Sequence, residues 1–261
     1  MADPWAINTL VFDLDDTLYP ERDYVFSGFR AVGEWMSDRH GVSGFGTRAQ
    51  ARFAGGERGR VFDSTLADFG MEASPALIGE LVEVYRNHQP RINLFPDAFV
   101  ALEWASGRFN VALITDGYAS VQEKKITALG LERWIPCRII TDALGRHNWK
   151  PSPAAYRAVM DFFSGPAGGF VYIGDNPRKD FIGARRLGWR TIRIIRPEGE
   201  HANYQPAAHE AAEIEITSLD DLDRLLAEKC NASVSLKEAA KGCRSEGAKT
   251  QRVTPLDSSR V

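Results

Sequence analysis

Two kinds of hydrophobic pattern alternate along most of this chain. Short apolar runs rich in β-branched and aromatic residues are typical of buried strands, and apolar residues that recur every three or four positions are typical of helices. The strand-like runs cover residues 7–12, 109–114, 138–141, 170–173, 190–195 and 213–216. The helix-like stretches cover residues 96–106, 120–129, 153–163, 180–187 and 219–229. Strands that alternate with helices predict an α/β fold with a doubly wound, Rossmann-like parallel sheet.

A long segment near the start of the chain breaks this alternation. It has helical spacing and no convincing strand, and its expected helices cover residues 23–40, 47–69 (interrupted at 54–56) and 74–88. An all-helical segment inserted after the first strand predicts a small separate domain that covers the end of this strand. We therefore expect an α/β core at 1–20 and 91–229, and a helical cap domain at 21–90.

Composition and charge narrow the classes of partner. The 261 residues carry a net charge of −3, which provides no overall attraction to nucleic acid or to an anionic membrane. The sequence has no apolar run of the roughly 20 residues that span a bilayer, no signal-peptide pattern at its N-terminus and no CxxC pair among its three cysteines. We expect a cytoplasmic protein without nucleic-acid or membrane partners. Residues 230–261, rich in small and basic residues, are expected to form a poorly ordered basic tail.

Several predicted strands end in polar residues. Asp13 and Asp15 follow the first strand, and in extended chain their side chains share a face, where like charges are costly without a cation or a lysine. Thr115 and Asp175 follow two later strands, and Lys150 lies in a loop before Pro151. Because the carboxyl ends of parallel strands meet at one edge of a sheet, we expect these side chains to converge.

These residues resemble the motif set of the haloacid dehalogenase (HAD) superfamily of hydrolases. The motifs are Asp-Leu-Asp-Asp-Thr at 13–17, Thr115 at a strand end, Lys150 before a proline, and Gly174-Asp175 with Asp180 five positions on. The resemblance covers about residues 7–195, with the motifs in the family's order. The inserted helices are similar to the cap of the branch that contains phosphoglycolate phosphatase, β-phosphoglucomutase and the haloacid dehalogenases.

The resemblance implies roles for four carboxylates. Asp13 would be the nucleophile that forms an aspartyl-phosphate, and Asp15 would protonate the leaving oxygen and then deprotonate the attacking water. A Mg²⁺ ion would be held by Asp13, Asp175 and the backbone carbonyl of Asp15. Asp180 would lie behind these ligands or reach the ion through water.

The resemblance also implies a phosphoryl-binding set. The Thr115 hydroxyl, the backbone amides of Asp116 and Gly117, and the Lys150 ammonium would contact the phosphoryl oxygens, and Gly117 would let the backbone approach closely. The basic and aromatic residues of the expected cap are interpreted as solvated surface rather than as contacts to a leaving group. They are Tyr24, Phe26, Arg48, Arg52, Arg58 and Arg60.

The expected activity is Mg²⁺-dependent hydrolysis of a small phosphorylated metabolite, a phosphomonoester, by a monomer or homodimer. A phosphomutase would keep the same residues and stays open, as does a 2-haloacid dehalogenase. A dehalogenase needs neither an acid for its leaving group nor Mg²⁺, so Asp15 favours phosphoryl transfer. A non-catalytic binding module is a further alternative, disfavoured because Asp13, Lys150 and Asp175 are all present. Sugar phosphates, phosphoglycolate and nucleoside monophosphates all stay open as substrates.

The absence of several well-known motifs lowers the support for other enzyme classes. The sequence contains no GxxxxGK[ST] phosphate loop, no GxGxxG after a strand, no HExxH and no GxSxG. Nucleotide hydrolysis by a phosphate loop, dinucleotide redox chemistry, zinc proteolysis and serine hydrolysis therefore lose support.

Overall fold

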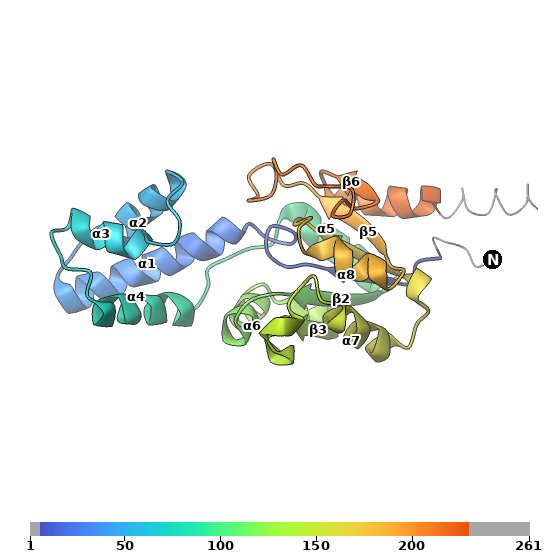
Figure 1. The fold of residues 1–261 in the computed structure, drawn as a ribbon, viewed down its shortest axis with the longest axis horizontal. Coiled ribbons are helices and arrows are strands. Elements are labelled where there is room, and N and C mark those ends of the chain that lie inside the picture. The colour runs from blue at the N-terminus through green and yellow to red at the C-terminus, as the bar shows by residue number, and fades with distance from the viewer. Residues whose placement is uncertain (1–5, 230–261) are drawn as a thin grey trace, which may run out of the picture.

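The computed structural model describes residues 6–229 and contains a parallel sheet flanked by helices (Figure 1). Within these residues the sheet has six strands in the order β3-β2-β1-β4-β5-β6, and every neighbouring pair is parallel. The strands are β1 (Thr9–Phe12), β2 (Asn110–Thr115), β3 (Cys137–Ile140), β4 (Phe170–Gly174), β5 (Arg190–Ile194) and β6 (Ile214–Ile216). The predicted doubly wound α/β fold is thus confirmed. The expected tail at 230–261 lies outside the described residues.

Alternating side chains of the strands build two apolar layers, one on each face of the sheet. Leu10 and Phe12 of β1 pack in one cluster, and Val11 packs in the other. The first layer is closed by α5 (Pro96–Ser106) and α6 (Ala119–Ala128), and the second by α7 (Ala154–Phe163) and α8 (Asp180–Arg186). A central strand covered on both faces reads as a continuous apolar run, which is why β1 was evident in the sequence.

Four helices follow β1 before the sheet resumes, and Figure 1 shows them grouped at one end of the molecule. These cap helices are α1 (Glu21–His40), α2 (Phe45–Ala54), α3 (Val61–Asp68) and α4 (Pro75–Asn87). The helical region expected at 47–69 with an interruption at 54–56 is indeed two helices, and the break covers residues 55–60, where Gly56 and Gly59 have positive φ and redirect the chain. The domain boundaries near residues 20 and 90 stay predictions.

The described helices also bear on the question of membrane association. Between residues 6 and 229 none of them combines the length and the apolar character that crossing a bilayer requires. The expected cytoplasmic location and the expected monomer or homodimer stay predictions.

Candidate active site

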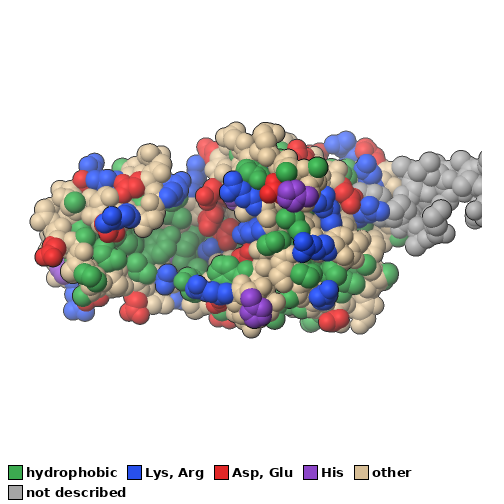
Figure 2. Space-filling model, viewed as in Figure 1, with side chains coloured by type: hydrophobic (Ala, Val, Ile, Leu, Met, Phe, Trp, Pro, Cys, Tyr) green, Lys and Arg blue, Asp and Glu red, His purple; other side chains and the backbone are tan. Residues whose placement is uncertain are grey.

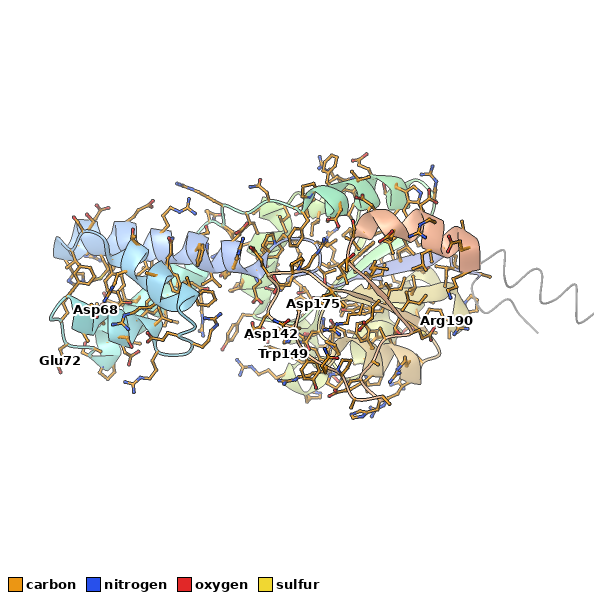
Figure 3. All side chains as sticks on the ribbon, turned by 90° about the horizontal axis from the view of Figure 1, so that it is seen from above. Asp68, Glu72, Asp142, Trp149, Asp175 and Arg190 are labelled. Atoms are coloured by element: carbon orange, nitrogen blue, oxygen red, sulfur yellow. The ribbon has the colours of Figure 1, made fainter. Side chains whose placement is uncertain are left out.

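The carboxyl ends of β1, β2 and β4 bring the predicted residues together at the central switch of strand order. Asp13 directly follows β1, Thr115 ends β2 and Asp175 directly follows β4. Lys150 reaches the same place from the loop before α7. The strand order reverses on either side of β1, and this is where open α/β sheets bind their ligands. In Figure 3, Asp175 lies at the edge of the core nearest the cap helices.

Lys150 forms the buried floor of the site. Its ammonium donates to Asp13 Oδ1 at 2.5 Å, to Asp180 Oδ1 at 2.7 Å and to the Tyr172 hydroxyl at 2.9 Å. The Lys150 side chain is 0% exposed. Burial lowers the pKa of this lysine, but the charges of Asp13 and Asp180 outweigh burial and hold the pKa well above its ordinary value. Lys150 is therefore a fixed cation between two carboxylates.

Three buried carboxylates cluster beside Lys150. Asp13, Asp175 and Asp180 each offer a carboxylate oxygen, and these oxygens lie within 4.8 Å of one another. Burial, opposed by Lys150 and reinforced by Asp180, raises the pKa of Asp13 to about 7. Burial and the charges of Asp180 and Asp13 hold the pKa of Asp175 well above its ordinary value. Such an excess of buried oxygen charge is the donor set that a hard divalent cation requires, so the residues fit the expected Mg²⁺.

Gly174 makes the close approach of Asp180 possible. A Cβ on Gly174 would lie 2.5 Å from Asp180 Oδ2, so only glycine fits at this strand end. The same oxygen accepts a hydrogen bond of 2.9 Å from the backbone amide of Asn176. Asp180 is thereby fixed from both sides at the start of α8.

The Asp15 carboxylate has hydrogen-bond partners that differ from those of Asp13. Its Oδ1 accepts from the Lys125 ammonium at 2.7 Å and from the Tyr19 hydroxyl, and its Oδ2 accepts from the Gln122 amide at 3.0 Å. Gln122 also donates to the Thr115 hydroxyl at 2.5 Å, so it links Thr115 to Asp15. Burial raises the pKa of Asp15, but the Lys125 charge and these hydrogen bonds outweigh burial and hold the pKa below its ordinary value.

Asp116 has a second role that sequence reasoning missed. Only its backbone amide was expected to act, but its Oδ1 accepts from the Thr141 hydroxyl at 2.7 Å and from the backbone amide of Lys150 at 3.2 Å. The Lys179 ammonium lies 3.6 Å from its other oxygen. The Asp116 side chain therefore fixes the loop that carries Lys150. Gly117 has a φ of +130°, a conformation that favours glycine.

Asp16, the third carboxylate after β1, joins the core to the cap helices. Its Oδ1 accepts from the backbone amide of Glu21 at 2.8 Å, at the start of α1. Its Oδ2 accepts from the backbone amide of Glu200 at 3.0 Å, in the loop after β5. Burial and the nearby charge of Asp15 raise the pKa of Glu21 to about 8, so the first turn of α1 lies beside the Asp15 carboxylate.

The expected surface residues of the cap have mixed outcomes. Arg48 and Arg52 pair with Asp68, which lies far from Asp175 in Figure 3, so these arginines belong to the outer cap. The expectation is wrong for Tyr24, whose ring is 6% exposed and lies 4.5 Å from the Lys125 ammonium.

Comparison with known proteins places this geometry among known hydrolases. Residues 10–194 match the family described as haloacid dehalogenase-like hydrolase. The chain is 30% identical to a phosphoserine phosphatase from Thermus thermophilus, with 74% of this chain and 92% of the relative covered. It is 26% identical to a glyceraldehyde 3-phosphate phosphatase from Methanopyrus kandleri, with 77% of this chain and 88% of the relative covered.

A solved structure of similar fold is the 2-haloacid dehalogenase from Pseudomonas syringae pv. tomato. It superimposes with a TM-score of 0.59 at 25% identity, and the match covers 85% of this chain and 99% of that one.

Proposed function

The chain belongs to the haloacid dehalogenase-like hydrolases, and from this premise we propose that it is a Mg²⁺-dependent phosphomonoester hydrolase. Its substrate is a small phosphorylated metabolite, and the reaction passes through an aspartyl-phosphate on Asp13. The observation that carries the proposal is the contact of Lys150 with both Asp13 and Asp180, beside Asp175. The family membership and the enzyme class expected from the four motifs are confirmed.

Asp13 is suited to attack phosphorus. The Lys150 ammonium at 2.5 Å orients its carboxylate and keeps positive charge where the phosphoryl group arrives. In the first half-reaction an Asp13 oxygen bonds to phosphorus while the bond from phosphorus to the ester oxygen breaks. In the second, a water oxygen bonds to phosphorus, the bond to Asp13 breaks and inorganic phosphate leaves.

Asp15 handles the protons of both half-reactions. It gives a proton to the leaving ester oxygen, and the resulting carboxylate takes a proton from the attacking water. The Lys125 ammonium at 2.7 Å and the Gln122 amide at 3.0 Å stabilise that carboxylate between the two half-reactions. This acid and its hydrogen-bonded support favour phosphoryl transfer over dehalogenation, whose halide leaving group needs no proton.

The oxygens of Asp13, Asp175 and Asp180 would hold the Mg²⁺ ion, with the Asp15 carbonyl as the further expected ligand. The ion would offset the negative charge of the phosphoryl group and of the surrounding carboxylates. Thr115, the backbone amides of Asp116 and Gly117, and Lys150 bind the phosphoryl oxygens in this proposal.

The test is hydrolysis of p-nitrophenyl phosphate by the full chain, with Mg²⁺ and after treatment with EDTA. We expect activity that needs Mg²⁺ and is abolished in Asp13→Asn. The matched control is Asp161→Asn, which changes an exposed aspartate on α7 and should leave the rate unchanged. Full activity in Asp13→Asn would contradict the proposal. Incubation with a bisphosphorylated sugar and analysis for an isomerised product tests the phosphomutase alternative.

A further inference from the structure

An apolar groove of about 300 Å³ opens between the cap helices. Its walls come from α1, the end of α2, α3 and α4, and the side chains that form them are Phe29, Phe53, Phe62, Ile78, Val82 and Tyr85. Figure 2 shows hydrophobic side chains recessed between the cap helices and the core, next to acidic side chains of the core. A concave apolar surface of this kind is typical of a small-molecule site.

Two sets of contacts link the groove to the candidate active site. In the first, Tyr85 of the groove lies edge-on to Tyr24, with ring centroids 5.8 Å apart. Tyr24 lies over the Lys125 ammonium, which binds Asp15. The groove wall is therefore connected through Tyr24 and Lys125 to the carboxylate proposed to protonate the leaving oxygen.

In the second, a smaller cavity of about 160 Å³ adjoins the groove. The two cavities share Val25, Phe53 and Arg58 as lining residues, and the smaller one is also lined by Asp16 and Glu21 of the segment that follows β1. Both sets of contacts include the first turn of α1, so the groove lies close to the motif that carries Asp13 and Asp15.

The chemistry of the walls decides what the groove accepts. Sugar hydroxyls, or the ammonium and carboxylate of an amino acid, cost free energy when buried without hydrogen-bond partners. Most wall side chains are apolar or aromatic, and the charged ones are Arg58, Asp63 and Arg86. The Arg86 guanidinium lies 4.4 Å from the Tyr118 ring centroid. The Asp63 carboxylate pairs with Arg60, and the Arg58 guanidinium lies 3.7 Å from the Phe53 ring centroid and donates to the Phe53 carbonyl at 2.7 Å.

We infer that the leaving group is an apolar alcohol, aryl-alkyl or branched alkyl, whose hydrocarbon part lies in this groove while its phosphate lies at Asp13. The inference rests on the proposed phosphomonoester hydrolysis and names its substrate class. Phe53 and Val82 act as specificity-determining residues through apolar contact. The Arg58 guanidinium lies over the Phe53 ring, and Phe26 and Phe29 contact this ring in edge-to-face arrangements, so neighbours on three sides fix the ring in the groove wall.

The test compares kcat/KM among esters of primary alcohols with similar leaving-group chemistry, assayed with the full chain and Mg²⁺. The series is methyl, butyl and 2-phenylethyl phosphate, with glycerol phosphate and phosphoserine as polar members. We expect kcat/KM to rise by about tenfold or more from methyl to 2-phenylethyl phosphate, and the polar esters to stay about tenfold below it. Equal rates, or a preference for a polar ester, would overturn the inference.

Variants separate the groove from the rest of the site. Phe53→Ala should lower the ratio of kcat/KM for 2-phenylethyl phosphate to that for methyl phosphate by about tenfold. Val82→Thr, which adds a hydroxyl at nearly constant shape, should lower the same ratio in a well-folded protein. The control Phe162→Ala changes an exposed ring on α7 and should leave the ratio unchanged.

These experiments distinguish a failure of the apolar leaving group from a failure of the proposed phosphomonoester hydrolysis. Loss of hydrolysis for every ester in the wild type would refute phosphomonoester hydrolysis itself. Hydrolysis with an unaltered ratio in both groove variants would refute only the apolar leaving group. A changed oligomeric state with an unaltered ratio would show that a second copy of the chain occupies the groove, and would also overturn the inference.

Discussion

Two lysine–carboxylate pairs meet at the carboxyl end of the sheet, and their surroundings differ. Lys150 and Asp13 have side chains that are 0% and 5% exposed, and their further partners, Tyr172 and Asp180, come from the core. The corresponding exposures of Lys125 and Asp15 are 5% and 20%. The core alone therefore holds the first pair, whereas the second pair lies toward the cap helices.

This difference separates two tasks of one site. The nucleophile needs a fixed position and a fixed cation, and a sealed floor provides both. Asp15, which acts first as acid and then as base, needs to exchange protons with a leaving group and with water, so its carboxylate lies closer to solvent. Tyr24 of α1 packs on Lys125, so the second pair contacts the cap helices, whereas the hydrogen-bond partners of Lys150 all come from the core.

The largest expected effect concerns Asp15. Asp15→Ala should lower turnover of an alkyl phosphate about 10²–10⁴-fold, because the leaving alkoxide then receives no proton. The loss should be much smaller for p-nitrophenyl phosphate, whose leaving group is stable without one. Equal losses for both substrates would show that Asp15 does something other than acid catalysis. The comparison is made from kcat values of the same preparation.

The next effect concerns the sealed pair. Lys150→Met leaves Asp13 and Asp180 buried without their cation, which should lower the free energy of unfolding by about 3–5 kcal/mol. Urea denaturation of the metal-free protein measures this change. Arg157→Met, at an exposed arginine on α7, is the control and should stay within about 0.5 kcal/mol of the wild type. A similar change in the free energy of unfolding in both variants would show that the buried cation of the site matters no more for stability than an exposed one.

A third prediction concerns the pH dependence of the second pair. The Lys125 charge holds the pKa of Asp15 below its ordinary value, against the effect of burial. In Lys125→Met burial acts without this charge, so the pKa of Asp15 should rise and its carboxylate should take up a proton at higher pH than in the wild type. Carbon-13 NMR of the side-chain carboxyl in the metal-free protein measures this titration. An unchanged or lower pKa would contradict the assigned role of Lys125.

The smallest expected effect concerns the link to the cap helices. Tyr24→Leu removes the ring over the Lys125 ammonium, a contact worth about 0.5–1 kcal/mol, and should lower kcat/KM for an alkyl phosphate roughly two- to fivefold. Tyr24→Phe keeps the ring and should restore the rate, which a purely structural role of the hydroxyl would not allow. An unchanged rate in Tyr24→Leu would show that Asp15 is independent of the cap helices.

The sequence predicted the sheet and the residues at the strand ends because both depend on local pattern. The apolar run of β1 and the motif spacing of Asp13, Lys150 and Asp175 can be read without knowing the packing. The interruption expected at 54–56 within the helical region 47–69 is present, but the break between α2 and α3 is longer, because Gly59 as well as Gly56 has a positive φ. Helix ends depend on backbone conformations that the hydrophobic pattern does not encode.

Side-chain partners of the site were the part that the sequence did not indicate. Lys124 and Lys125 are neighbours of identical type, but the first is half-buried and donates to Asn87 at the end of α4, whereas the second is buried against Asp15. Gln122 and Lys125 are three positions apart on one face of α6, a signal that has meaning only once that face is known to lie over the strand ends. Tyr172 likewise resembled an ordinary core residue of β4.

The most direct test of the central claim is mass spectrometry of the protein quenched in acid during turnover of a phosphomonoester with Mg²⁺. The account predicts one added phosphoryl group on the peptide that contains Asp13, absent in Asp13→Asn and increased in Asp15→Ala when p-nitrophenyl phosphate is the substrate. The increase follows because the attack of water on the intermediate then lacks its base. A phosphoryl group on another residue, or none on Asp13 in the Asp15→Ala protein, would contradict the account.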